Sequence, residues 1–332
     1  MTKILNFGSL NLDYVYQVEH FVRPGETITS LARNVNCGGK GLNQSIALSK
    51  AGANVYHAGK IGSDGKMLED FLDSQNVNTD FVFTGEGASG HAVIEVDSSG
   101  QNSIILYPGT NSQIDSAMID KVLEGFSEGD YLVLQNEINN IPEIMEKAHR
   151  KGMFIVINPS PITHELLSYP LHYVSLLIVN EIEGEMLSGE KTPSGMLAAL
   201  RKKYDANILL TLGASGAMYS GGGKVIKYGI HKAPVVDTTA AGDTMLGFFT
   251  GLLSQGYKPA DALSIATKAS SITVSGKGAA ASIPTLAAAL ECPYEYVEFS
   301  GGEGNKDDKD DKKDENFKEG SSKKGKSRKG GK

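Results

Sequence analysis

The sequence predicts an α/β protein with a doubly wound, mainly parallel sheet, helices on both faces and a small β-sheet lid. Three observations predict this fold class. Short runs of β-prone apolar residues recur with Gly, Asn or Pro behind them, amphipathic helical patterns separate several of these runs, and two further segments are strand-like but stand outside this alternation. Strand, helix and strand in repetition are typical of a parallel sheet closed by right-handed crossovers.

The expected strands of the main sheet follow one another along residues 4–213. They are ILNFG, NVYHAGKIG, YLVLQNE, FIVINPS, LLIVNE and NILLTLG. Helical patterns lie between several of them, in LNQSIALSKAGA, MLEDFLDSQ, IPEIMEKAHRKG and SGMLAALRKKY. Because nearly continuous apolar strands are buried on both sides, helices should cover both faces of the sheet.

The segments outside this alternation predict a second, smaller sheet. Side chains of alternating character flank DSSG on both sides in HAVIEVDSSGQNSIILYPG, which predicts an antiparallel hairpin. A further β-prone stretch is GETITSLARNVNCGG. We therefore expect lid segments near residues 11–37 and 88–110. A sheet of few strands cannot bury both faces alone, so it should cover the active-site mouth or a partner subunit.

Composition excludes several classes of protein. The 332 residues are 40% hydrophobic and 21% charged, which is in the ordinary globular range. No apolar stretch is long enough to span a membrane and the start of the chain does not resemble a secretory signal, so we expect a cytoplasmic protein without a membrane partner. Cys37 and Cys292 fit neither a disulfide framework nor a CxxC site, and we expect reduced thiols.

The last 32 residues differ in composition from the rest. Residues 301–332 contain eleven basic and eight acidic side chains, so residues 1–300 carry −10 of charge against −7 for the whole chain. We predict one α/β domain over 1–300 and a disordered charged tail over 301–332, because the tail is too polar to build a core. Its basic end could contact nucleic acid, but the acidic remainder argues against nucleic acid as the main partner.

VVDTTAAGDTMLGFFTGLL, residues 235–253, predicts a tight turn that opens a helix. Small residues at 240–242 would leave backbone amides open at the helix N-terminus, where a phosphate group is favoured. Asp243 is then a carboxylate placed beside a phosphate, where it could handle a proton. The alternative is an ordinary helix-capping acid.

A second glycine-rich turn, GGKGLNQSIALSKAG at residues 38–52, also leads into a helix. It lacks the GxxxxGK[ST] pattern of a P-loop. Lys40, Asn43 and Gln44 could line a sugar-like pocket, or Lys40 could simply be solvated. In GSLNLD, Asn11 and Asp13 are alternate residues and share a face, although Asn and Asp are also common turn formers.

Other motifs are absent or out of context. Gly85, Gly87 and Gly90 match GxGxxG, but a strand follows them instead of a helix, so the dinucleotide-binding context is missing. The seven histidines show no HExxH or paired spacing, which argues against zinc chemistry, and there is no GxSxG elbow.

The two glycine-rich turns together resemble the ribokinase-like (PfkB) family of carbohydrate kinases over residues 3–290. GGKGLNQ resembles the first signature of that family and DTTAAGDT the second. VNEIE at 179–183 resembles its NxxE element, TLGASG at 211–216 its nucleotide loop, and GKGAAASIP at 276–284 the segment over adenine and a monovalent cation. The chain departs from the family at Met245, where Phe is common, and at Met67, where Gly is expected.

The resemblance implies an ATP-dependent sugar kinase, expected to convert D-ribose to D-ribose 5-phosphate. Fructose, deoxyribose, other pentoses and nucleosides such as adenosine stay open as substrates, as does a non-catalytic sugar- or nucleotide-binding protein on the same fold. Asp243 would be the general base that takes the proton of the attacking hydroxyl. The amides of Ala240, Ala241 and Gly242 would hold the charge that develops on the transferred phosphoryl group.

The resemblance also implies the remaining site residues. The sugar would be held by Asn11, Asp13, Gly39, Lys40, Asn43 and Glu137 together with Asp243, and the nucleotide by Asn180, Thr211, Gly213 and Gly216. Asn180 and Glu183 would arrange Mg²⁺ through water, and Asp237, Thr239, Thr273, Gly276, Gly278 and Ser282 would hold K⁺. Independently of the resemblance, Glu137 ends a predicted strand, where ligands of doubly wound sheets lie. The resemblance also implies that the lid pairs with the lid of a second copy, so a homodimer is expected.

Overall fold

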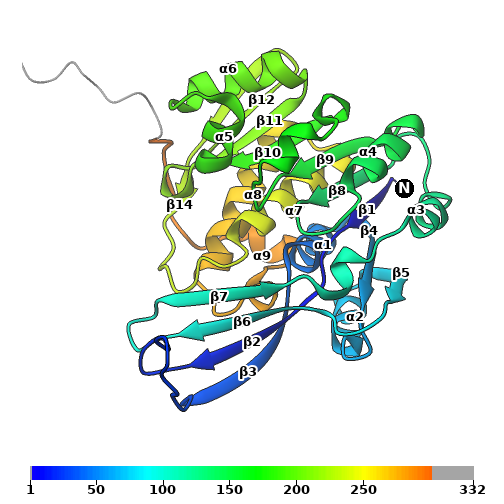
Figure 1. Cartoon of the computed structure of the whole chain (residues 1–332). Coiled ribbons are helices and arrows are strands. Elements are labelled where there is room, and N and C mark those ends of the chain that lie inside the picture. Colours follow the sequence, from blue (N-terminus) through cyan, green and yellow to red (C-terminus); the bar gives the residue numbers. More distant parts are fainter. Residues whose placement is uncertain (1, 301–332) are drawn as a thin grey trace, which may run out of the picture. The chain divides into compact units, whose positions relative to one another are not determined.

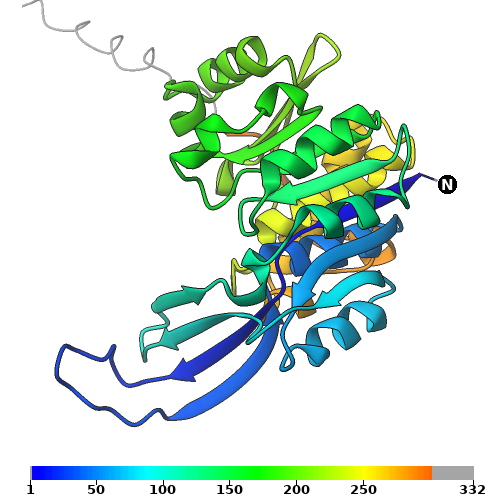
Figure 2. The same cartoon turned by 45° about the vertical axis from the view of Figure 1, so that its right-hand side comes forward.

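A computed structural model describes residues 2–300, and the predicted tail at 301–332 lies outside the described residues. Within residues 2–300, none of the helices has the length and apolar character needed to cross a membrane. The main feature is a nine-stranded sheet with the order β13-β12-β11-β10-β9-β8-β1-β4-β5 (Figures 1 and 2).

The strands from β11 to β5 in this order are parallel, and β12 and β13 extend one edge in antiparallel fashion. All six expected strands are present in it. The bounds are β1 Lys3–Phe7, β4 Asn54–Ile61, β5 Asn78–Thr84, β8 Tyr131–Gln135, β9 Phe154–Asn158, β10 Leu176–Asn180, β11 Asn207–Thr211, β12 Ala217–Gly221 and β13 Lys224–Tyr228. A two-stranded ladder, β14 Ile230–His231 with β15 Tyr296–Val297, lies outside this sheet.

Helices cover both faces, which confirms the doubly wound architecture. Neighbouring strand residues separate into two buried clusters. Val133 belongs to the cluster that contains side chains of α1, α2, α7, α8 and α9, and Leu132 belongs to the one that contains side chains of α3, α4, α5 and α6. The bounds are α1 Lys40–Lys50, α2 Lys66–Ser74, α3 Ser116–Leu123, α4 Ile141–Arg150, α5 Glu181–Ser188, α6 Pro193–Tyr204, α7 Ala241–Ser254, α8 Pro259–Val274 and α9 Leu286–Leu290. Short 3₁₀ turns occupy Gly109–Ser112, Glu165–Ser168, Leu171–Tyr173, Gly213–Ser215 and Ala280–Ser282.

The second sheet has the order β3-β2-β6-β7, and we call it the small sheet. It contains β2 Asn11–Gln17, β3 Ala32–Gly38, β6 Gly90–Val96 and β7 Asn102–Tyr107. The predicted hairpin is confirmed by the antiparallel β6–β7 pairing, and β2 pairs in parallel with β6. In Figure 1 these strands project away from the helices of the main sheet.

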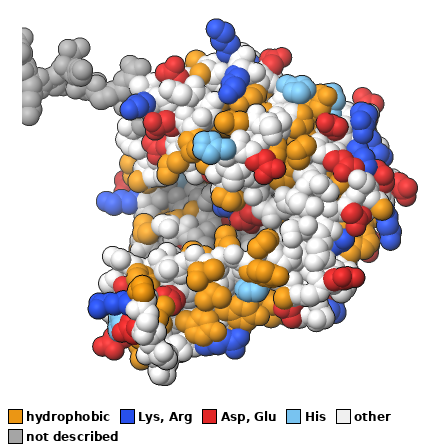
Figure 3. Space-filling view, in the orientation of Figure 1, with side chains coloured by type: hydrophobic (Ala, Val, Ile, Leu, Met, Phe, Trp, Pro, Cys, Tyr) orange, Lys and Arg blue, Asp and Glu red, His pale blue; other side chains and the backbone are white. Residues whose placement is uncertain are grey.

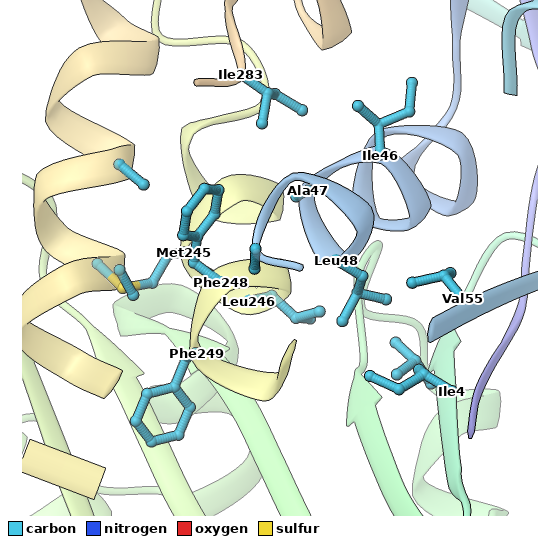
Figure 4. Close-up of a cluster of buried hydrophobic side chains, with 14 of the residues drawn as sticks. Ile4, Ile46, Ala47, Leu48, Val55, Met245, Leu246, Phe248, Phe249 and Ile283 are labelled. Atoms are coloured by element: carbon cyan, nitrogen blue, oxygen red, sulfur yellow. The ribbon is translucent and has the colours of Figure 1, made fainter. Parts of the chain in front are cut away.

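Helices α1 and α7 pack in direct contact, and this packing positions the candidate site. A Cβ on Gly247 would lie 2.3 Å from Ala47 Cβ, and one on Gly251 would lie 3.1 Å from Ala51 Cβ. The matched order of these contacts shows that the helices run in the same direction. Figure 4 shows the apolar side chains around the contact, including Leu48 and Phe248. One turn before Gly247 on α7 is Asp243, and one turn before Ala47 on α1 is Asn43, so these polar side chains also meet.

Candidate active site

Asp243 is the third residue of α7 and is buried, with 8% of its surface exposed. Its side chain does not cap the helix. Instead, its carboxylate accepts hydrogen bonds from Gln44 Nε2 at 2.9 Å and from Asn43 Nδ2 at 3.2 Å, both on α1. The carboxylate is therefore held by two amides at the end of the helix that borders a cavity.

The N-terminus of α7 leaves backbone donors open. Ala240 precedes the helix with φ +62°, whereas the other non-glycine residues with positive φ in the described part are Asn or Asp. Within residues 2–300, the N–H groups of Gly242 and Asp243 have no hydrogen-bond acceptor, whereas that of Ala241 donates to Thr238 O at 3.3 Å. A Cβ on Gly242 would meet nothing within 4 Å. Open amides at a helix N-terminus suit an anion such as phosphate.

The residues expected to hold the sugar lie where α1 meets the ends of β1 and β8. Lys40 N donates to Glu137 Oε2 at 3.0 Å, and Ser9 Oγ donates to the same oxygen. Asn43 is buried, and its Oδ1 has no partner among the described residues. A buried oxygen without a partner is expensive in the free protein, so a hydroxyl donor from a ligand would be favoured there.

The small sheet brings the polar residues of β2 toward the residues expected to hold the sugar. Asn11 accepts from Asn111 Nδ2 at 2.8 Å through its Oδ1. Gly38 lies opposite Asn11 in the β2–β3 ladder and is packed against the carboxylate of Asp13. Gly39 follows with φ +93° and leads directly into α1. Backbone glycine at this turn therefore links the small sheet to the helix that contacts Asp243.

Burial and mutual repulsion perturb the acids of this region. Burial, helped by the charge of Glu137, raises the pKa of Asp13 to about 7. Burial also raises the pKa of Glu137, although Ser9 and Lys40 partly offset it. Burial alone would lower the pKa of Lys40, but the carboxylates of Asp243, Glu137 and Glu183 outweigh it and raise that pKa. Lys40 is thus a cation held in place by surrounding acids, and strongly perturbed groups of this kind cluster at functional sites.

Asn180 and Glu183 form a capping box at the start of α5. Asn180 Oδ1 accepts from Glu183 N at 2.9 Å, and Glu183 Oε2 accepts from Asn180 N at 3.0 Å. Glu183 is buried, and within residues 2–300 its Oε1 accepts no hydrogen bond. The box fixes both side chains and leaves one carboxylate oxygen for a ligand, such as the water shell of a hard cation.

A cavity of about 220 Å³ joins these parts. Seven of the predicted residues line it: Lys40, Asn180, Glu183, Thr211, Ala240, Gly242 and Asp243. Glu137 lines a neighbouring cavity of about 600 Å³ beside Asn136 and Tyr169. Asn11, Asp13, Gly39, Asn43, Ala241, Gly213 and Gly216 line neither cavity. Figure 3 shows a hollow in the molecular surface between the small sheet and the rest of the chain.

The two glycines expected at the nucleotide have different environments. Gly213 has φ +51° and open space where a Cβ would stand, so a ligand can approach it. Gly216 has φ +104° and packs against the backbone of Tyr228, with 2.2 Å between the position of a Cβ and Tyr228 O. Gly216 is therefore needed for packing of the loop onto β13.

The residues expected to hold a monovalent cation come from two loops that meet. Asp237 Oδ1 accepts from Thr239 N at 2.9 Å, and Asp237 Oδ2 accepts from Gly278 N at 3.1 Å. Burial opposes the charge of Asp237, but these amides outweigh it and lower its pKa. Gly276 lies against Ser282, and Thr273 precedes this loop at the end of α8. In residues 2–300 there is no cluster of three or more His, Cys, Asp or Glu that could hold a metal ion.

Sequence reasoning missed several polar residues of the site. Asn158 lines the cavity and contacts Gln44 at 3.4 Å, Asn111 contacts Asn11, and Ser9 contacts Glu137. Asn158 could have been found, because it ends the predicted strand FIVIN as Asn180 ends LLIVN. Asn111 left no such signal, because it belongs to a 3₁₀ turn after the small sheet.

Comparison with known proteins gives consistent results. A family model described as pfkB family carbohydrate kinase matches residues 1–286. Ribokinase of Staphylococcus aureus is 35% identical over 301 residues, which cover 86% of this chain and 97% of that protein.

Two solved structures extend the likeness to the fold. Ribokinase of Cryptococcus neoformans in complex with ADP has a TM-score of 0.79 and 33% identity, and it covers 88% of this chain and 99% of that one. Ribokinase of Arabidopsis thaliana complexed with ribose and ATP has a TM-score of 0.77 and 29% identity, covering 88% and 98%. These findings confirm the fold class and the resemblance deduced from the two glycine-rich turns.

Proposed function

The chain belongs to the pfkB family of carbohydrate kinases, phosphotransferases with an alcohol acceptor, and from that premise we propose that it converts D-ribose and ATP to D-ribose 5-phosphate and ADP. The observation that carries the proposal is the placement of Asp243. Its carboxylate is held by Asn43 and Gln44 next to the open amides of α7, and it lines the same cavity as Asn180 and Glu183.

The chemistry that we propose is a direct transfer. The primary hydroxyl oxygen of the sugar forms a bond to the γ-phosphorus, the bond from that phosphorus to the bridging oxygen breaks, and ADP leaves. The proton of the hydroxyl goes to Asp243. The amides at 240–242 hold the charge on the transferred group, although that of Ala241 also donates to Thr238 O, and Gly242 leaves room for the phosphate because it has no side chain.

The proposed roles of the other residues follow their positions. Asn11, Asp13, Gly39, Lys40, Asn43 and Glu137 hold the sugar, and Thr211, Gly213 and Gly216 with Asn180 hold the nucleotide. Mg²⁺, held through water by Asn180 and Glu183, would neutralise phosphate charge. Asp237, Thr239, Thr273, Gly276, Gly278 and Ser282 would hold K⁺, supported by the contact between their two loops.

Substrate choice is tested by measuring ATP consumption with Mg²⁺ and K⁺ across ribose, deoxyribose, fructose and adenosine, and by locating the phosphate on each product. We expect ribose to be preferred and phosphorylated at its primary hydroxyl. Preference for another acceptor would change the proposed substrate and leave the proposed phosphoryl transfer unchanged. No turnover with any acceptor, together with measurable ATP binding, would favour the non-catalytic alternative.

Asp13 gives a prediction about pH. Its pKa is about 7 in the folded protein against 3.8 for the ordinary group, so the folded state binds more protons between these values. Stability from this group is therefore present at low pH and lost as the pH rises through about 7, by up to about 4 kcal/mol. We expect Asp13→Asn to be more stable than wild type at pH 8, with the difference vanishing below pH 4. Denaturant unfolding of both proteins without sugar measures this, and equal slopes with pH would contradict it.

We also propose a homodimer through the small sheet. The edge strand β7 exposes Ile104, Ile105, Leu106 and Tyr107, each at least 52% exposed. Asp13 pairs with Ala92 of β6, and Ala92 pairs with Leu106 of β7, so Leu106 lies on the same face of the small sheet as Asp13. Ile105 lies on the opposite face. Figure 3 shows hydrophobic side chains gathered over this part of the surface. A long apolar edge strand of this kind is normally covered.

Ile105→Lys should therefore shift the protein from dimer to monomer in sedimentation experiments, because a charge would be buried in the interface. Val225→Lys on β13 is the matched control, since Val225 is 56% exposed but lies on the other sheet. A monomeric wild type, or an unchanged dimer in the Ile105 variant, would contradict the proposed interface.

A further inference from the structure

We propose that Gln44, held in one orientation by Gln135 and Asn6, is the positioning residue that aims the carboxylate of Asp243 at the substrate. This inference deepens the proposed function and rests on it. Gln44 is fully buried and donates from Nε2 to Asp243 Oδ1 at 2.9 Å. Asn43 Oδ1 has no partner among the described residues, whereas Gln44 has both amide atoms bonded to other side chains, Nε2 to Asp243 and Oε1 to Gln135.

The hydrogen bonds that Asp243 accepts from Asn43 and from Gln44 should respond differently when a sugar binds. Asn43 donates to Oδ2 at 3.2 Å, and its own Oδ1 has no partner among the described residues. In the proposed mechanism Asn43 contacts the sugar, so its amide has to serve two groups. Gln44 holds the other oxygen from behind and keeps its bond whether or not sugar is present. Oδ2 carries the longer of the two hydrogen bonds, and it is the oxygen that we expect to take up the proton.

Gln135 decides which way the amide of Gln44 points. Gln135 Nε2 donates to Gln44 Oε1 at 2.7 Å and to Asn6 Oδ1 at 2.8 Å. Because the oxygen of Gln44 is occupied by this donor, its nitrogen must face Asp243. A flipped amide would place an oxygen against the carboxylate and a nitrogen against the nitrogen of Gln135, and both contacts would be repulsive.

The arrangement is anchored in the core of the sheet. Asn6 Nδ2 donates to Gly41 O at 2.7 Å and to Ser45 Oγ at 2.8 Å, and Ser45 Oγ lies 2.8 Å from His57 Nδ1. All of these side chains are almost fully buried. Burial lowers the pKa of His57 to about 3, so the ring is neutral at physiological pH. Within residues 2–300, Gln135 Oε1 and His57 Nε2 have no hydrogen-bond partner. The amide orientations are still determined, because the backbone carbonyl of Gly41 fixes the amide of Asn6, which in turn fixes that of Gln135.

Gln44 also connects the two halves of the cavity. The same Nε2 lies 3.4 Å from Asn158 Oδ1, and Asn158 Nδ2 lies 3.5 Å from Glu183 Oε2. The base and the capping box of α5 are thus joined through two amide side chains. The expected benefit is alignment, since small misplacements of reacting groups are costly in rate.

The test uses Gln44→Met, which keeps the length of the side chain and removes the donor. We expect kcat with ribose to fall about tenfold to a hundredfold, KM for ribose to change less than threefold, and the acid limb of the kcat profile to move to higher pH, because the ionised carboxylate loses a donor. The other charged groups around the cavity, Lys40, Glu137 and Glu183, are unchanged in this variant. Thr250→Val on α7 is the matched control, because it removes another buried polar atom, one without a partner in residues 2–300.

A second variant and a second readout keep the inference separable from folding and from the proposed function. Gln44→Asn keeps a neutral amide that is one methylene too short to reach both Gln135 and Asp243, and it decides the case if the Met variant does not fold. In sugar-free protein, ¹³C spectroscopy of the Asp243 carboxyl, assigned by its loss in Asp243→Asn, should show a higher titration midpoint in the Gln44 variants. An unmoved midpoint and unchanged kcat would overturn the inference. If the wild type does not phosphorylate ribose but the titration midpoint of Asp243 moves in the Gln44 variants, the positioning role of Gln44 is supported and the proposed substrate is wrong.

Discussion

Asp243→Asn should reduce turnover by about 10²- to 10⁴-fold while ATP and ribose still bind, because the variant loses the group that accepts the hydroxyl proton. The fold should tolerate the change. Asn43 can flip its amide and present its unpaired Oδ1 to the new donor, and Gln44 can keep its bond to the remaining oxygen. Steady-state kinetics and calorimetric binding of each ligand measure the two effects separately.

Two outcomes would contradict this assignment. Turnover within tenfold of wild type would mean that another group takes the proton. Loss of ribose binding by more than tenfold, with turnover lost in proportion, would mean that Asp243 serves as a sugar ligand and not as the base. Melting curves of the variant and the wild type serve as the control, because they show whether a folding defect accounts for the loss of turnover.

Gly247→Ala should cost at least about 3 kcal/mol of stability, seen as a fall in melting temperature of about 5 °C or more. The added Cβ would lie 2.3 Å from Ala47 Cβ and 2.8 Å from the backbone of Ala47 and Leu48. None of these atoms belongs to a flexible side-chain end, so α1 and α7 have to move apart. Their separation would also pull Asn43 and Gln44 away from Asp243, and turnover should fall with stability.

Gly251→Ala is the matched control, one turn further along the same helix. There the new Cβ would lie 3.1 Å from Ala51 Cβ, and Leu48 O would be 3.4 Å away. The better helix propensity of Ala contributes about 1 kcal/mol and should offset this milder contact. Equal melting temperatures for the two variants would show that the contact at Gly247 does not set the helix spacing.

Several features of the fold were predictable because they are local. The six strands of ILNFG to NILLTLG are buried runs with turn formers behind them, and the structure contains each of them. The β6–β7 hairpin follows from alternation around DSSG. Helices α3, α5, α8 and α9 were not predicted. In α5 only eight residues are helical, and its exposed Ile182 and Met186 obscure an amphipathic pattern.

The candidate site was predictable in part. The two glycine-rich turns carried the resemblance, and comparison with known proteins confirms the family. Gln44 was considered for a sugar pocket, but the structure places its amide on Asp243. The antiparallel strands β12 and β13 at the sheet edge were not anticipated either, although the sheet is mainly parallel as expected.

The sequence by itself determined six strands of the main sheet, the hairpin of the small sheet, the two glycine-rich turns and the polar residues that follow the strands, because each depends on neighbouring residues. Only the tertiary structure decided that residues 200 positions apart meet, as Asn43 and Asp243 do. The physical reason is the close packing of α1 on α7 at Gly247 and Ala47, which depends on the shape of two distant segments at once. The orientation of the Gln44 amide has the same origin, since Gln135 and Asn6 come from two other strands of the sheet.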